Sequence, residues 1–237
     1  MRNRLIVLIL AAAATAALSP RLFAQSAKPA KSAKSSKAFN PRDLSGVWEY
    51  DHFHAALFPK GTTPPFTAWG EARFKDSDVL VNDPNLGCLP HGVPRIMFVP
   101  LPMEVFQIPG RVMIEQESLN ELRQIHLDRP HLKDPDPSFN GDSVGKWEGN
   151  TLVVDTIGFN DVTWLDHVGL PHSDQLHVTE RIRRVDHDTL QDDFTIEDPK
   201  TFTKPWTTSQ GYKLRPSWEL MEYVCQENNH YVFHPEK

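Results

Sequence analysis

Short runs of alternating hydrophobic and polar residues dominate the chain from residue 39 onward, and turn-forming residues separate these runs. Alternation places every second side chain on the same face, which is typical of a half-buried β-strand, whereas helical periodicity is scarce. The runs predict strands or hairpins at residues 44–50, 104–117, 122–128, 143–156, 175–185, 189–197 and 218–226. One short helix is predicted at residues 67–75, where it is expected to cover one end of the domain.

The order of these elements predicts the fold class. About eight or nine strands follow one another without the alternation of strand and helix that builds a parallel nucleotide-binding sheet. We therefore predict an all-β, mainly antiparallel fold, a single lipocalin-like meander barrel with long loops. Pro109-Gly110 suits the central positions of a type II turn in the first hairpin.

Two long irregular passages interrupt the strands. Residues 53–102 are rich in Pro and Gly, and residues 159–173 contain the bend Gly169-Leu170-Pro171. Long loops within a compact domain often bind ligands. We expect the 88–95 and 159–174 loops to line the mouth of the barrel.

The N-terminal residues have the layout of a secretory signal, with Arg2 and Arg4 before an apolar run at residues 5–18. This run is shorter than the roughly 20 residues of a membrane-spanning helix, and no later run approaches that length. Residues 1–24 are predicted to be the signal peptide, and residues 25–38, rich in Lys, Ala and Ser, a disordered linker. The folded domain is predicted at residues 39–237, in the periplasm or secreted, with no retained membrane helix.

Charge is distributed unevenly along the chain. The first 38 residues hold seven Lys or Arg and no acid, so the remainder has 18 basic and 31 acidic residues. Its net charge is therefore −13, against −6 for the whole chain. Such a surface repels phosphate backbones, so no nucleic-acid partner is expected.

The sequence contains two cysteines, Cys88 and Cys225. In an exported protein a lone pair of cysteines most often forms one disulfide. A thiolate nucleophile is the alternative, and an oxidising compartment disfavours it.

Two resemblances rest on short phrases in the sequence. Gly46-Val47-Trp48 resembles the Gly-x-Trp motif that opens the first strand of lipocalins, whose Trp packs at the closed end of a barrel holding an apolar ligand. The chain also resembles a family of uncharacterised exported proteins of soil bacteria, through DPNLGCLPHGVPR (83–95), SVGKWEGNTLVVDT (143–156), HSDQLHVTER (172–181) and ELMEYVCQEN (219–228). This second resemblance implies an exported β domain but no particular activity or catalytic residue.

Residues 161–181 concentrate three Asp and three His in one loop and the strand that follows it. A carboxylate beside an imidazole is the minimum for general acid–base catalysis, because His titrates near neutral pH and the acid fixes its tautomer. The catalytic candidates are Asp161, Asp166, His172 and His177, paired as Asp166/His172 or Asp161/His177. The alternative is that the acids only accept hydrogen bonds within the loop.

Four other residues are candidates for ligand binding. His91 and Arg95 lie in the Pro-rich loop, where an Arg side chain can bind a carboxylate through two hydrogen bonds. The alternative is that Arg95 pairs with a carboxylate of the domain and orders the loop. Trp164 and Trp206 are expected in loops, which suits either a flat apolar ligand or packing within the loops.

Neither a metal ion nor a cofactor is expected. His52 and His54 would share a face of an extended first strand, with His172 or His177 as a possible third ligand, but no known metal-binding motif is present.

We therefore predict a small-molecule-binding barrel for a partly apolar ligand. One alternative is a lyase, isomerase or hydrolase that uses an Asp/His pair, and another is an envelope protein that binds a partner protein through an edge strand.

Overall fold

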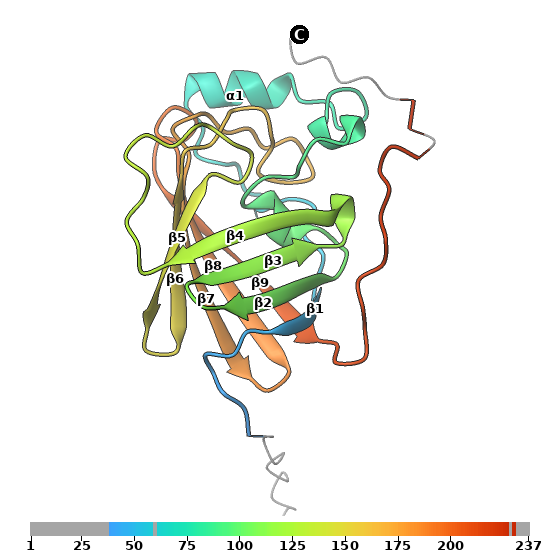
Figure 1. Ribbon diagram of the computed structural model, residues 1–237. Helices are drawn as coiled ribbons and strands as arrows, with labels where there is room; N and C mark the ends of the chain where they lie inside the picture. Colours follow the sequence, from blue (N-terminus) through green and yellow to red (C-terminus); the bar gives the residue numbers. More distant parts are fainter. Residues whose placement is uncertain (1–37, 59–60, 228, 231–237) are drawn as a thin grey trace, which may run out of the picture. The chain divides into compact units, whose positions relative to one another are not determined.

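Strands paired edge to edge into a closed barrel form the body of the molecule, which confirms the predicted all-β fold (Figure 1). The computed structural model describes residues 38–58, 61–227, 229 and 230, so the predicted signal peptide and all but the last residue of the predicted linker lie outside the described residues. Within them the strands are β1 (Gly46–Tyr50), β2 (Met103–Ile108), β3 (Arg111–Gln116), β4 (Glu121–Leu127), β5 (Asp142–Glu148), β6 (Thr151–Ile157), β7 (His177–Asp186), β8 (Thr189–Glu197) and β9 (Trp206–Leu214). The helices are α1 (Ala68–Lys75) and the short 3-10 helices η1 (Pro84–Gly87), η2 (Arg95–Phe98) and η3 (Ser118–Asn120).

The strands follow one another around the barrel in sequence order, and β1 closes it by pairing with both β2 and β9. All neighbouring strands are antiparallel except β4 and β5, which run parallel with Ile125 opposite Ser143. The barrel therefore departs from a simple meander at this point. The connection at residues 128–141 returns the chain alongside β4 before β5 begins, as a parallel pair requires.

The strand that closes the barrel is β9, and the prediction of a closing strand at residues 218–226 is wrong. The alternation in β9 is weak because the polar side chain of Gln210 is buried there and is followed by Gly211. Residues 218–226 alternate more clearly in sequence, but they run along the outside of the barrel as irregular, mostly exposed chain (Figure 1, red).

Side chains from all parts of the barrel pack in its interior. The apolar ones include Trp48, Ile125, Leu152, Val154, Phe194 and Ile196, which are almost completely buried. Charged side chains are buried there as well, since Arg123, Glu180 and Asp192 each have no exposed surface. Arg123 donates to both carboxylate oxygens of Glu180, through Nη1 at 2.8 Å and through Nη2. Burial, reinforced by the charge of Glu180, raises the pKa of Asp192 well above its ordinary value.

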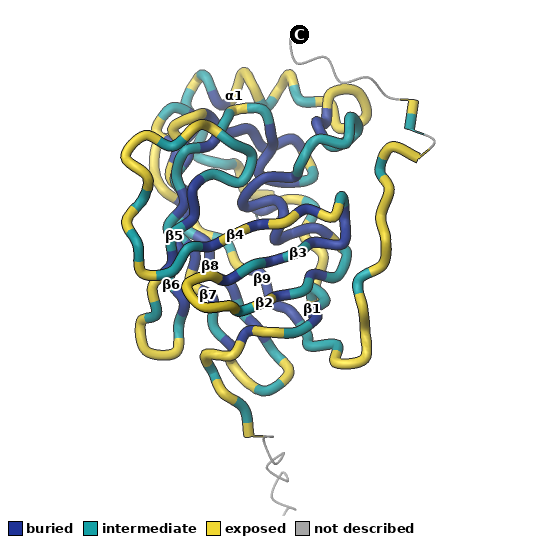
Figure 2. Tube along the Cα trace, viewed as in Figure 1, coloured by how far each residue is buried: buried dark blue, intermediate teal, exposed yellow. Residues whose placement is uncertain are grey.

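Loops and α1 gather at one end of the barrel (Figure 1, top). Beneath them η2 is buried, and Tyr212 Oη donates to the carbonyl oxygen of Met97 at 2.7 Å. The helix α1 confirms the predicted one and is exposed along most of its length (Figure 2), with only Gly70 buried. A Cβ at Gly70 would lie 2.3 Å from the carbonyl oxygen of Thr201, so the close approach of α1 to this loop requires glycine. None of the helices in the described part of the chain has the length and apolar character needed to cross a bilayer.

Candidate functional site

A cleft of about 650 Å³ lies among the loops beside α1. Its walls come from residues 56–58 and 61–66, from α1 and from residues 166–170. They are mainly apolar, with Phe58, Phe66, Phe74, Val168 and Leu170 around the carboxyl group of Asp166. The volume lies within the range of small-molecule sites, and we call this site the apolar cleft.

Asp166 holds two walls of the apolar cleft together. Its Oδ1 accepts the N–H groups of Val168 at 3.0 Å and Leu170 at 2.9 Å, and its Oδ2 accepts the N–H of Leu57 at 3.2 Å. Burial raises the pKa of Asp166, although these N–H groups act in the opposite direction. The carboxyl group is thus occupied by backbone donors, and the predicted Asp166/His172 pair is not formed.

Asp161, His172 and Trp164 line a second pocket, of about 570 Å³. Within it, His172 Nδ1 lies 3.0 Å from the carbonyl oxygen of Ser173, and Nε2 lies 2.8 Å from Thr163 Oγ1. A carbonyl oxygen only accepts, so Nδ1 carries the proton and Nε2 accepts from the hydroxyl group. Burial lowers the pKa of His172 and favours this neutral form. Because both nitrogens are engaged, His172 has a structural role here.

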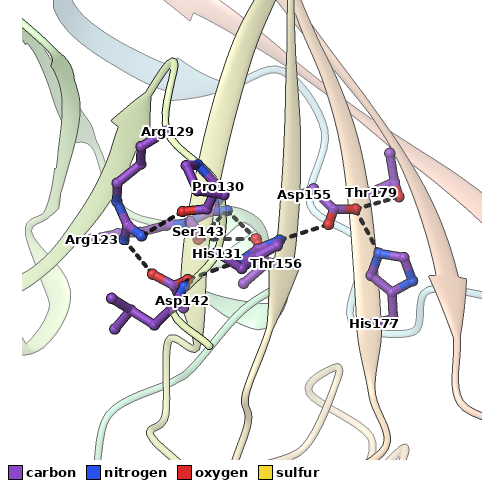
Figure 3. A network of polar contacts seen from close by, with 11 residues as sticks. Arg123, Arg129, Pro130, His131, Asp142, Ser143, Asp155, Thr156, His177 and Thr179 are labelled. Carbon is purple, nitrogen blue, oxygen red and sulfur yellow. Dashed lines mark hydrogen bonds and ion pairs between the residues drawn. The ribbon is translucent and has the colours of Figure 1, made fainter. Parts of the chain in front are cut away.

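His177 pairs with Asp155, and not with Asp161 as predicted. Its Nε2 lies 2.6 Å from Asp155 Oδ1, and the other carboxylate oxygen lies 2.7 Å from His131 Nε2 (Figure 3). The strand register explains the contact, because Asp155 of β6 is opposite Thr179 of β7, two residues after His177. The sequence pointed to His177 but not to its partner.

His131 extends this network to a second carboxylate. Its Nδ1 lies 2.9 Å from Asp142 Oδ2, while Arg129 donates to Asp142 Oδ1. Both ring nitrogens of His131 therefore face carboxylate oxygens of the barrel wall, one on β5 and one on β6. We call the chain Arg129–Asp142–His131–Asp155–His177 the outer-wall network. It fastens residues 129–131 to the outside of the barrel.

The outer-wall network is expected to make stability depend on pH in the acid range. Burial acts to raise the pKa of Asp155, but hydrogen bonds from His177 and His131 outweigh it and leave this pKa below its ordinary value. Because the pKa is depressed in the folded state, the stabilisation is present above the unfolded-state pKa of about 3.9 and is lost as pH falls through the folded-state value.

Asp155→Asn should therefore be less stable than wild type at about pH 6, by up to about 1 kcal/mol, as is usual for solvent-accessible pairs. The difference should shrink toward zero near pH 2. Urea unfolding at the two pH values measures it, and a difference of equal size at both would contradict this role.

Arg95 pairs with a carboxylate of the domain, which the sequence analysis gave as the alternative to ligand binding. Its two terminal nitrogens donate to the two carboxylate oxygens of Asp83, at 2.8 and 2.7 Å, and the pair is buried. Burial and the nearby Arg95 charge lower the pKa of His167, which lies 3.3 Å from Arg95, to about 4. The guanidinium group therefore orders the loop and is not presented to a ligand.

Trp206 is the first residue of β9 and does not lie in a loop. Its ring centroid is 4.2 Å from that of Phe58 and 5.5 Å from that of Phe202. Because Phe58 lines the apolar cleft, Trp206 supports this wall from behind. Trp206 itself is not among the residues that line the apolar cleft.

His91 is buried between two side chains that sequence reasoning did not select. Its Nδ1 lies 2.9 Å from Glu121 Oε2, and its Nε2 lies 3.4 Å from Ser118 Oγ. Nearby, Cys88 and Cys225 form the predicted disulfide, with their Cα atoms 5.8 Å apart. The disulfide attaches the irregular C-terminal segment to the loop that contains His91, and no thiol remains to act as a nucleophile.

His52 and His54 are exposed, and His52 contacts Asp51 at 3.4 Å. In the described part of the chain no group of three His, Cys, Asp or Glu side chains is arranged to hold a metal ion.

No protein-family model, curated protein or solved structure matches this chain. The geometry itself defines the class of protein, a closed mixed β-barrel with clefts built from its loops. The resemblances to lipocalins and to the soil-bacterial family stay predictions.

Proposed function

We propose that this chain is an exported β-barrel protein that binds a small, partly apolar molecule in the apolar cleft. The supporting observation is the composition of the cleft, in which aromatic and aliphatic side chains surround one buried carboxyl group. The disulfide fits an oxidising compartment, the periplasm or the cell exterior.

The chemistry of the cleft indicates the kind of ligand. From the described residues, Asp166 Oδ1 accepts two backbone N–H groups and Oδ2 accepts one. A carboxylate oxygen can accept two hydrogen bonds, so Oδ2 can accept one more. A ligand with a flat apolar body and one hydrogen-bond donor matches this arrangement. The ligand site differs from the one expected from the sequence, because protein side chains fill the barrel interior and the cleft lies among the loops.

The two alternative functions have less support in this form. Neither predicted acid–base pair is formed, since Asp166, His172 and His177 each have other partners. Within the described residues every barrel strand is paired on both sides, so the barrel offers no free edge to a partner protein.

Binding of N-phenyl-1-naphthylamine tests the proposal, because this uncharged dye has an apolar aromatic body and one N–H donor. A fluorescence titration should saturate with one site per chain. Val168→Trp should fill the cleft and weaken binding at least about tenfold, or 1.4 kcal/mol.

Val185→Trp is the matched control, since Val185 is equally apolar and half exposed but lies on β7 and does not line the cleft. It should bind the dye like wild type. Equal affinity of both variants, or the absence of saturable binding, would count against a ligand site in the apolar cleft.

A further inference from the structure

Ser118, His91 and Glu121 lie in the order hydroxyl, imidazole, carboxylate. Ser118 Oγ is 3.4 Å from His91 Nε2, and His91 Nδ1 is 2.9 Å from Glu121 Oε2. All three residues are at most 7% exposed, so the contacts are shielded from water. This is the arrangement by which serine hydrolases activate a hydroxyl group, and the contact between nucleophile and base is often long before a substrate binds.

Glu121 is fixed in the orientation that such a site needs. Besides the imidazole, its oxygens accept the backbone N–H of His91 at 2.8 Å and of Gly92 at 3.3 Å. Burial acts to raise the pKa of Glu121, but the contacts with His91 and Gly92 outweigh it and keep this pKa low. An ionised Glu121 holds the proton of His91 on Nδ1, which leaves the Nε2 lone pair facing the hydroxyl group of Ser118.

A cleft and a strained stretch of backbone lie beside these residues. A cleft of about 470 Å³ is lined by Cys88, Pro90, Leu119, Asn120, Glu121 and the segment 223–226. In the described chain the non-glycine residues with positive φ are Cys88, Leu119, Asn120 and Asp128, and the first three of them line this cleft. Leu119 has φ 62° directly after Ser118, a conformation that costs on the order of 1–3 kcal/mol and is found preferentially at functional sites.

We propose that Ser118 is the nucleophile, His91 the general base and Glu121 the orienting acid of a second site, which hydrolyses small uncharged carboxylic esters. The cleft has apolar contributions from Pro90, Leu119 and Val224, which suit a short acyl chain. It shares no lining residue with the apolar cleft, so this inference does not depend on the proposed ligand binding.

The reaction needs water as its only co-reactant. Ser118 Oγ bonds to the ester carbonyl carbon while its proton passes to His91 Nε2. The carbon–oxygen bond to the alcohol then breaks, and His91 gives the alcohol its proton. Water, deprotonated by His91, attacks the acyl-serine, and the acid leaves as the proton returns to Ser118 Oγ.

Hydrolysis of p-nitrophenyl acetate and butyrate by the intact, disulfide-bonded chain tests the proposal, together with labelling by an alkyl fluorophosphonate and mass mapping of the adduct. We expect hydrolysis above the buffer rate and one adduct, on Ser118. Ser118→Ala and His91→Gln should each lower kcat/KM at least about 10³-fold. Ser118→Ala should keep the fold, because it removes only one long hydrogen bond.

Ser45→Ala, at an exposed serine outside the cleft, is the control and should hydrolyse and label like wild type. Covalent labelling of Ser118 by the fluorophosphonate is a readout that a structural role of this residue would not produce. Hydrolysis and labelling that persist in Ser118→Ala would overturn the proposal. A folded wild type that neither hydrolyses the esters nor takes the label would overturn it as well.

Discussion

Arg123→Ala is expected to destabilise the domain by about 3–5 kcal/mol, because it leaves the carboxylate of Glu180 buried without its partner. Both side chains have no exposed surface, and the guanidinium group binds both oxygens of Glu180. The pKa of Asp192 beside them is raised well above its ordinary value, so Asp192 supplies no positive charge that could replace the guanidinium group. A loss of this size is a large part of the stability of an ordinary domain.

Urea unfolding at neutral pH measures this effect, and Arg181→Ala provides the matched control. Arg181 also pairs with a glutamate, Glu148, at 3.2 Å, but on the exposed outer face of the barrel. Its removal should change the free energy of unfolding by less than about 1 kcal/mol. Similar losses for the two variants would mean that the interior pair is hydrated or dispensable.

Removal of the disulfide is the second change with a large expected effect. Cys88 and Cys225 are 137 residues apart in sequence, so the disulfide closes a loop through most of the folded domain. The chain-entropy model gives about 5 kcal/mol for a loop of this length, because the unfolded chain regains the conformations that the link excludes. The native segment also has other anchors, such as the hydrogen bond from Asn120 Nδ2 to the carbonyl oxygen of Tyr223 at 2.8 Å.

We therefore expect Cys88→Ala/Cys225→Ala to fold with the barrel intact and to unfold at a much lower guanidinium concentration than wild type. Reduced wild type is the control and should unfold at the same guanidinium concentration as the double variant. If the double variant is as stable as oxidised wild type, the disulfide does not contribute to the stability of the domain.

The strands were predictable where each face of the barrel is chemically uniform. In β6, buried Leu152, Val154 and Thr156 alternate with the more exposed Val153 and Asp155, and the predicted hairpin agrees with the observed one within one residue at each end. In β9 the buried residues include Gln210, so the same rule missed the strand. The same rule wrongly predicted a strand at residues 218–226, because alternation in the sequence does not show whether a segment has a strand to pair with.

The sites were predictable only as residue types. His91 and His177 were selected because imidazoles suit acid–base chemistry, but their partners Glu121 and Asp155 lie 30 and 22 residues away. Asp155 could have been found from the register of β6 and β7, had that register been known. For Asp166 and His172, closeness in sequence suggested a pair, whereas the loop directs the two side chains into different pockets.

By itself the sequence determined the period-2 alternation of most strands, the turns between them and the single pair of cysteines, because these depend on local geometry and on composition. Only the tertiary structure decided which strand closes the barrel and that three charged side chains lie among the apolar ones in its interior. It also decided that Ser118, His91 and Glu121 meet beside a cleft. Such contacts join segments far apart in the chain, and their energies depend on burial and register, which no local pattern of residues encodes.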